Sequence, residues 1–277
     1  MPDPTPALTP PATPEATPPA TPEATTREPA LHPALDGIDL VVFDKDGTLI
    51  SFEAMWAGWA RDLGTRLELA TRRPVAGDVF TTIGFDPVAN RVQPGGPLAI
   101  ATMAGIEELI GAVLRRWCPS VAAARRILAD AWFEPDPVAL AVPLADLGGL
   151  FAAIRGTGRR IAVATTDDRR PTEATLAALG LAGLVDGVLC GDDDGPTKPD
   201  PDALRELARQ LGIAVGRTAM VGDTPADLAM ARGAGARAIG VTSGLGGMAD
   251  LHPLADAVVA SVGDLGGDLL DGPGSRA

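Results

Sequence analysis

From residue 37 onward, short apolar runs alternate with longer segments whose apolar residues have helical spacing. Six runs rich in β-branched residues are typical of strands that are buried on both faces of a sheet; they are residues 38–43, 161–164, 185–190, 218–222, 236–241 and 257–260. Helices are predicted before and between the later strands, at residues 144–155, 172–179, 202–211 and 226–233. This alternation predicts right-handed β-α-β units and therefore an α/β fold with a parallel sheet.

The interval between the first two predicted strands has a different pattern. Residues 53–139 contain amphipathic stretches, such as 54–69 and 106–117, and little that is typical of a buried strand. Because the interval is too long for a loop inside a compact domain, we predict a helical domain inserted into a Rossmann-like core of residues 37–52 and 140–277. All four tryptophans lie in the insertion. We expect most of them to form its own core, and lining a substrate cavity is the alternative.

Residues 1–36 have a composition of their own. They hold 11 of the 26 prolines, and the octet TPPATPEA occurs twice, starting at Thr9 and at Thr17. Proline at this density favours extended, solvated chain over a packed fold. We therefore expect a disordered tail, with a docking motif for a proline-recognising partner as the alternative.

Charge and composition exclude several classes of function. A net charge of −13 argues against a nucleic-acid or anionic-membrane partner. Two histidines are too few for a multi-histidine metal site, and His32, in the tail, leaves only one for a catalytic triad. Two cysteines, the lack of a secretory signal and the lack of an apolar run of about 20 residues favour a cytoplasmic protein. The chemistry must therefore use carboxylates, lysine, threonine or backbone groups.

Polar residues of these kinds follow directly after predicted strands. Asp44 and Asp46 follow the first strand, Thr165 the second and Asp223 the fourth, and Lys198 lies in the loop after the third. Since ligands bind beyond the carboxyl ends of parallel strands, we expect these side chains to converge.

Such a cluster suits one type of chemistry. Several carboxylates in one pocket repel one another unless a cation is bound, and oxygen ligands without histidine or cysteine favour Mg²⁺. Lysine and threonine suit the oxygens of a phosphoryl group. One carboxylate can attack phosphorus to form an aspartyl-phosphate, and a second can protonate the leaving oxygen.

Four motifs in order resemble those of the haloacid dehalogenase superfamily. They are DKDGT at residues 44–48, Thr165 at a strand end, Lys198 before Pro199, and GDTPAD at residues 222–227. The insertion between the first two resembles the C1 cap of this superfamily. The resemblance implies that Asp44 is the nucleophile and a metal ligand, and that Asp46 is the general acid/base with its backbone carbonyl on the metal. It further implies that Thr165 and Lys198 hold the phosphoryl group, that Asp223 binds Mg²⁺, and that Asp227 is an outer or alternative ligand.

Some assignments leave alternatives open. Thr166 competes with Thr165 for the phosphoryl group, and Asp227 has the alternative role of capping the next helix. Asp192, in the acidic loop 192–194, is a weaker metal candidate. Arg91 is a candidate for binding a substrate carboxylate, with a surface arginine as the alternative.

The resemblance implies a Mg²⁺-dependent phosphatase that acts on a small phosphorylated metabolite, with phosphoglycolate phosphatase as the nearest activity. The alternatives are a phosphomutase of the β-phosphoglucomutase type and a binding module that has the fold without catalysis. The expected partner is the metabolite alone, and the protein is expected to be a monomer or a homodimer.

Overall fold

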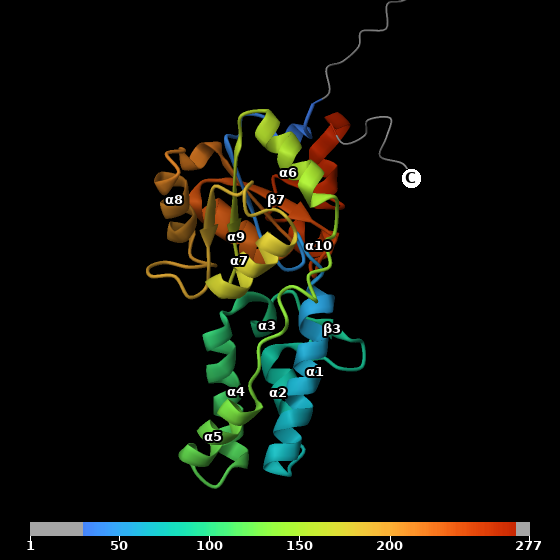
Figure 1. Cartoon of the computed structure of the whole chain (residues 1–277), viewed down its shortest axis with the longest axis vertical. Coiled ribbons are helices and arrows are strands. Elements are labelled where there is room, and N and C mark those ends of the chain that lie inside the picture. The colour runs from blue at the N-terminus through green and yellow to red at the C-terminus, as the bar shows by residue number, and fades with distance from the viewer. Residues whose placement is uncertain (1–29, 270–277) are drawn as a thin grey trace, which may run out of the picture.

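A computed structural model describes residues 30–269, which include a six-stranded parallel sheet in the upper half of the view (Figure 1). The strand order is β5-β4-β1-β6-β7-β8. The bounds are β1 (Leu40–Phe43), β4 (Arg160–Ala164), β5 (Gly187–Leu189), β6 (Thr218–Gly222), β7 (Arg237–Val241) and β8 (Ala257–Val259). The α/β prediction is confirmed. Because the strand order reverses between β1 and β6, the ligand site of such a sheet is expected at this point.

Helices cover both faces of the sheet, and the side chains of β1 alternate between them. Val41 and Phe43 pack on the face of α6 and α7, where Phe43 stacks on Phe151 at a centroid distance of 5.2 Å. Leu40 and Val42 pack on the face of α8, α9 and α10. The bounds are α6 (Leu147–Gly156), α7 (Arg169–Ala178), α8 (Pro201–Gln210), α9 (Pro225–Ala234) and α10 (Met248–Leu251).

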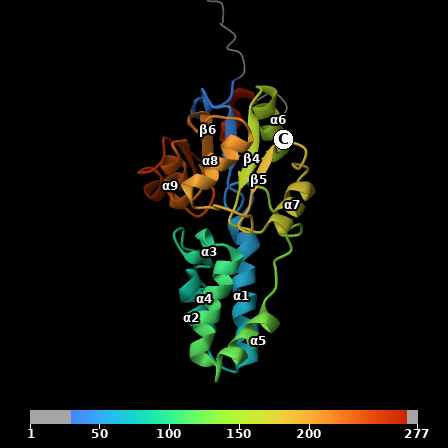
Figure 2. The ribbon, with the colours of Figure 1, turned by 90° about the vertical axis from the view of Figure 1, so that its left-hand side faces the viewer.

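The segment between β1 and α6 forms a helical unit, hereafter the cap, that projects from one end of the sheet (Figures 1 and 2). Ser51 begins the first cap helix by accepting a hydrogen bond from the backbone N–H of Ala54. The elements are α1 (Phe52–Thr71), α2 (Ala76–Ile83), β2 (Phe85–Asp86), β3 (Arg91–Val92), α3 (Pro97–Ile100), α4 (Met103–Trp117) and α5 (Val121–Ala131). Within residues 30–269, no helix is both long and apolar enough to cross a membrane.

The tryptophans of the cap serve two purposes. Trp59 lies between Trp56 and Trp132, with edge-on ring contacts at centroid distances of 5.6 and 5.5 Å. The Trp59 indole also donates a hydrogen bond to the backbone oxygen of Phe133. Trp56 and Trp132 line cavities between the cap and the sheet. These aromatic residues therefore belong to the packing of the cap and to the cavity walls at the same time.

The expected tail boundary at residue 36 differs from the structure, in which residues 30–36 contact the core. Leu35 is fully buried and Leu31 nearly so, around the short 3-10 helix Pro33–Leu35. The backbone N–H of His32 donates to the carbonyl of Leu265, and the Arg237 guanidinium donates to the carbonyl of Asp36. Leu31 and Leu35 are few and lie next to the proline-rich segment, so the sequence did not indicate that they are buried. Residues 1–29, with the repeated octet, lie outside the described residues.

We predict that Leu35→Ala lowers the free energy of unfolding by about 2–4 kcal/mol, because the change leaves a cavity in a packed site. Leu69→Ala is the matched control, since Leu69 is 75% exposed on α1; its effect is expected to be below about 0.5 kcal/mol. Denaturant unfolding measures both. Equal stability of the two variants would show that residues 30–36 do not contribute to the core.

Candidate active site

The carboxyl ends of three neighbouring strands deliver the predicted site residues. Phe43 of β1 pairs with Val163 of β4 and with Val221 of β6. Asp44 follows β1, and its backbone N–H donates to the carbonyl of Val221. Thr165 and Asp223 directly follow the other two strands. The convergence expected from the sequence is therefore present, and it lies at the reversal of strand order between β1 and β6.

Lys198 lies at the centre of this group, although its loop comes after β5. Its Nζ is 2.5 Å from Oδ1 of Asp44, 2.6 Å from Oδ1 of Asp227 and 3.3 Å from the backbone oxygen of Ala164. The contacts with Asp44 and Ala164 are hydrogen bonds, and the contact with Asp227 is an ion pair. Burial lowers the pKa of Lys198, but the two carboxylates raise it more strongly, and the net shift is upward. Lys198 is therefore charged and fixed.

Asp223 is held in a pocket made largely of backbone. The Thr48 hydroxyl donates to Oδ1 at 3.1 Å, and the backbone N–H of Leu245 donates to Oδ2 at 2.8 Å. A Cβ at Gly47 or at Gly244 would overlap the Asp223 carboxylate, and Gly47 has a φ of +92°. The role of Gly244 had no signal in the sequence beyond a turn-forming GLGG.

Asp227 performs the capping role and also reaches the site. Its Oδ2 accepts hydrogen bonds from the backbone N–H and the hydroxyl of Thr224, at 3.1 and 2.7 Å. This capping box begins α9. Oδ1 is the atom that contacts Lys198. Asp227 thus caps α9 through Oδ2 and reaches the site through Oδ1, so both predicted locations apply to one carboxylate.

The buried charge of this cluster fits a divalent cation. Carboxylate oxygens of Asp44, Asp223 and Asp227 lie within 4.8 Å of one another, and all three residues are buried. Lys198 offsets only one of the three charges. Burial raises the pKa of Asp44 to about 6, against the effect of Lys198. Burial, followed by repulsion from Asp44 and Asp227, raises the pKa of Asp223 well above its ordinary value. A hard cation such as Mg²⁺ relieves this repulsion.

The acidic loop lies apart from this cluster. Asp192 is exposed and accepts a hydrogen bond from the backbone N–H of Arg169 at 2.8 Å. The Arg169 guanidinium pairs with Asp193 at 2.7 Å. Asp192 and Asp193 group with Cys190 rather than with Asp44, so their charges are engaged in holding this loop to α7.

Asp46 lies on the cap side of the site and is held by a residue that was not predicted. Nζ of Lys45 is 2.7 Å from Oδ2 of Asp46 and 3.1 Å from Oδ2 of Asp167. Oδ1 of Asp46 is buried and has no hydrogen-bond partner within residues 30–269. Neither Lys45 nor Asp167 stood out in the sequence, since each looked like an ordinary loop residue beside a recognisable motif.

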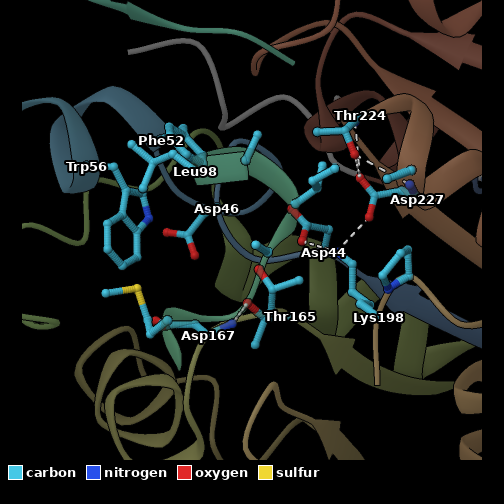
Figure 3. A pocket seen from close by; sticks show the side chains of 17 residues that line it. Asp44, Asp46, Phe52, Trp56, Leu98, Thr165, Asp167, Lys198, Thr224 and Asp227 are labelled. Atoms are coloured by element: carbon cyan, nitrogen blue, oxygen red, sulfur yellow. Dashed lines mark hydrogen bonds and ion pairs between the residues drawn. The ribbon is translucent and has the colours of Figure 1, made fainter. Parts of the chain in front are cut away.

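The pocket shows which predicted residues share a space (Figure 3). Asp44, Asp46, Thr165, Thr166 and Lys198 all line it, together with Asp227. The Thr165 hydroxyl also accepts a hydrogen bond from the backbone N–H of Asp167. Arg91 does not line this pocket or the larger cavity beside it; it is exposed on β3 in the cap.

A larger cavity opens beside the reaction pocket. The reaction pocket has a volume of about 30 Å³ and the adjoining cavity about 290 Å³. They share Trp56, Met103 and Asp167. Besides Asp167, four carboxylate side chains line the larger cavity: Glu107, Glu134, Asp168 and Asp192. No basic side chain among the described residues lines it. Burial raises the pKa of Asp168, and Asp192 and Glu134 raise it further.

Known proteins match this chain over most of its length. A family model for "haloacid dehalogenase-like hydrolase" matches residues 38–235. A phosphoglycolate phosphatase of Rhodospirillum rubrum is 32% identical over 195 residues, which cover 70% of this chain and 76% of that protein. One from Vibrio cholerae is 26% identical and covers 86% and 97%. The structure of a "predicted phosphoglycolate phosphatase" from Haemophilus somnus has a TM-score of 0.59 at 18% identity, covering 83% and 96%, which shows the same fold.

We predict that Gly244→Ala raises the concentration of Mg²⁺ needed for half-maximal hydrolysis by about tenfold, or about 1.4 kcal/mol, because the added methyl group overlaps the Asp223 carboxylate and the backbone oxygen of Gly47, beside it, so that one of them must move. Gly58→Ala on α1 is the control, since a Cβ at Gly58 meets no atom within 4 Å. Titration of activity with Mg²⁺ measures the effect. An unchanged Mg²⁺ requirement in folded Gly244→Ala would contradict a ligand role for Asp223.

Proposed function

This chain belongs to the haloacid dehalogenase-like hydrolase family, and we propose that it is a Mg²⁺-dependent phosphatase of small phosphorylated metabolites. The observation that carries the proposal is the buried Asp44 at the reversal of strand order, with one oxygen bound by Lys198. Lys198 occupies Oδ1, which leaves Oδ2 for attack on phosphorus. Asp46 lines the same pocket with an unpartnered oxygen. A nucleophile and a proton donor therefore face one small space.

Hydrolysis by these residues has two steps. Oδ2 of Asp44 attacks phosphorus, the bond from phosphorus to the ester oxygen breaks, and Asp46 gives its proton to the departing oxygen. Water then attacks the phosphorus of the aspartyl-phosphate, Asp46 takes a proton from this water, and the bond from phosphorus to Oδ2 of Asp44 breaks, which releases inorganic phosphate and restores the carboxylate. Lys198, Thr165 and Thr166 bind the phosphoryl oxygens. A bound Mg²⁺ supplies positive charge for these oxygens, and Asp44, Asp223 and the backbone carbonyl of Asp46 would hold it, with Asp227 as the alternative ligand.

The cap supports a small substrate. Phe52 and Trp56 of α1 and Leu98 of α3 line the reaction pocket from the cap side. All three are buried, so the cap covers the site with apolar side chains that exclude water from the reacting group. A phosphoryl group on a folded protein or a long nucleic acid does not fit beneath this cover.

The negative charge on the wall of the larger cavity affects which leaving groups the site can accept. Phosphoglycolate, the substrate in the names of the relatives, would place a second anion next to the carboxylates of Glu107, Glu134 and Asp168. The cavity offers no basic partner among its described lining residues, whereas the indoles of Trp56 and Trp132 suit a neutral or cationic group. We therefore propose that the preferred phosphomonoester has a leaving group without negative charge, which departs from the phosphoglycolate-like substrate that the resemblance implies.

We predict that Asp44→Asn reduces hydrolysis of p-nitrophenyl phosphate to the uncatalysed level, because the amide is a poor nucleophile and a weaker metal ligand. Asp62→Asn, an exposed change on α1, keeps full activity. Release of inorganic phosphate with Mg²⁺ and with a chelator is the measurement, and circular dichroism reports folding. Turnover by a folded Asp44→Asn enzyme would contradict the assignment of Asp44 as the nucleophile. If the unchanged enzyme transfers the phosphoryl group to a sugar phosphate without releasing inorganic phosphate, the protein is a mutase.

We predict that kcat/KM for phosphoethanolamine and ethyl phosphate exceeds that for phosphoglycolate by about 30-fold. Like charges about 8 Å apart near a protein surface repel by about 2 kcal/mol, and the three compounds are nearly equal in size. Glu107→Gln is expected to narrow the difference, and Glu108→Gln, one residue further on α4 and outside the cavity lining, is expected to leave it unchanged. Phosphoglycolate as the best of the three substrates would contradict the proposed selectivity.

A further inference from the structure

Lys45 occupies an unusual place for a lysine. The chain has only two lysines among its 23 basic residues, Lys45 and Lys198. Both are buried within the site, with side chains 1% and 7% exposed. Lysine is almost never fully buried unless it is paired. Lys198 has a role in the proposed function, whereas nothing in that function uses Lys45.

Lys45 links two loops that carry site residues. Its own loop follows β1, between Asp44 and Asp46, and its second partner, Asp167, lies two residues beyond Thr165 in the loop after β4. Asp167 is itself fixed, because its Oδ1 accepts the backbone N–H of Asp168 at 3.0 Å and its own N–H donates to the Thr165 hydroxyl. One buried cation thus sets the distance between the Asp46 carboxylate and the loop that holds the phosphoryl group.

The contact distinguishes the two oxygens of Asp46. Oδ2 of Asp46 lies 2.7 Å from Nζ of Lys45 and forms the ion pair with it. The other oxygen, Oδ1, has no hydrogen-bond partner within the described residues, and Asp46 lines the reaction pocket. The ion pair through Oδ2 therefore fixes the direction in which the Asp46 carboxyl group enters the reaction pocket.

We propose that Lys45, held in turn by Asp167, is a positioning residue that orients the Asp46 carboxyl group so that it gives its proton to the ester oxygen. The inference rests on the proposed function, in which Asp46 is the acid. In that step the bond from phosphorus to the ester oxygen breaks, the bond to Asp44 forms, and the proton passes from the Asp46 carboxyl group to the departing alkoxide. Direct binding of the phosphoryl group by Lys45 does not fit, because Lys45 is 1% exposed and does not line the pocket.

The test compares leaving groups that differ in their need for a proton. We expect Lys45→Met to lower kcat/KM for ethyl phosphate about 100-fold, within the range that a general acid contributes. The value for 2,4-dinitrophenyl phosphate should fall by less than about threefold, because its phenolate leaves without a proton. Arg126→Met, which removes an exposed basic side chain from α5, is the control and leaves both values unchanged. A purely structural defect lowers both substrates alike and would overturn the proposal.

A double variant tests whether Lys45 acts through Asp46. Asp46→Asn alone should show the same dependence on the leaving group, and adding Lys45→Met should cost little more with ethyl phosphate, because residues that act as a unit are not additive. Additive losses would overturn the positioning role. If Asp46→Asn itself lacks the leaving-group dependence, the assignment of the acid in the proposed function is wrong. If only Lys45→Met lacks it, the positioning role alone is wrong.

Asp167→Asn provides a milder variant in case Lys45→Met does not fold, since removing the cation leaves two carboxylates buried together. The asparagine keeps the shape of Asp167 and leaves Lys45 beside Asp46, but weakens the bond that fixes Nζ. We expect a smaller loss with the same selectivity, about tenfold for ethyl phosphate and less than about twofold for 2,4-dinitrophenyl phosphate. Equal losses for the two esters would overturn the role of Asp167.

Discussion

The structure depends on negative charge that is buried where the strand order reverses. Asp44, Asp223 and Asp227 bring three carboxylates within 4.8 Å of one another, and Lys198 offsets one of them. Isolated charges are expensive to bury, so each carboxylate needs fixed partners. Those partners come from separated parts of the chain: the loop after β5 supplies Lys198, a hydroxyl and a backbone N–H hold Asp223, and a helix cap holds Asp227. The fold brings these separated partners to one place.

Much of this arrangement follows from pattern. Each of the six strands was predicted within a few residues, because strands buried on both faces are continuous apolar runs. The residues that follow them, Asp44, Thr165 and Asp223, could then be placed together without knowing any side-chain contact, since parallel strands end at one edge. The pattern of strands did not place Lys198 next to Asp44, because Lys198 lies within a loop rather than directly after a strand. The resemblance of Lys198-Pro199 to a family motif indicated that it belongs to the site.

Other features depend on tertiary contacts that leave little trace in sequence. Lys45 and Asp167 gain their meaning only when the loops after β1 and β4 lie side by side. Gly244 is needed because a carboxylate from another strand passes close to its backbone. Residues 30–36 directly follow the proline-rich segment and hold only one proline, and Leu31 and Leu35 are buried.

The reaction pocket and the adjoining cavity differ in how much of their lining comes from the cap. The reaction pocket is small, about 30 Å³, and most of its polar atoms come from loops at the rigid edge of the sheet. The adjoining cavity is about 290 Å³ and takes Glu107 from α4 and Trp132 and Glu134 from the segment after α5. Catalytic groups keep their function only when they are displaced by much less than 1 Å. We therefore expect few substitutions at the sheet edge to preserve activity. Glu107 and Glu134 line the larger cavity and not the reaction pocket, so we expect their substitution to alter which phosphomonoester is chosen while the residues at the sheet edge keep their positions.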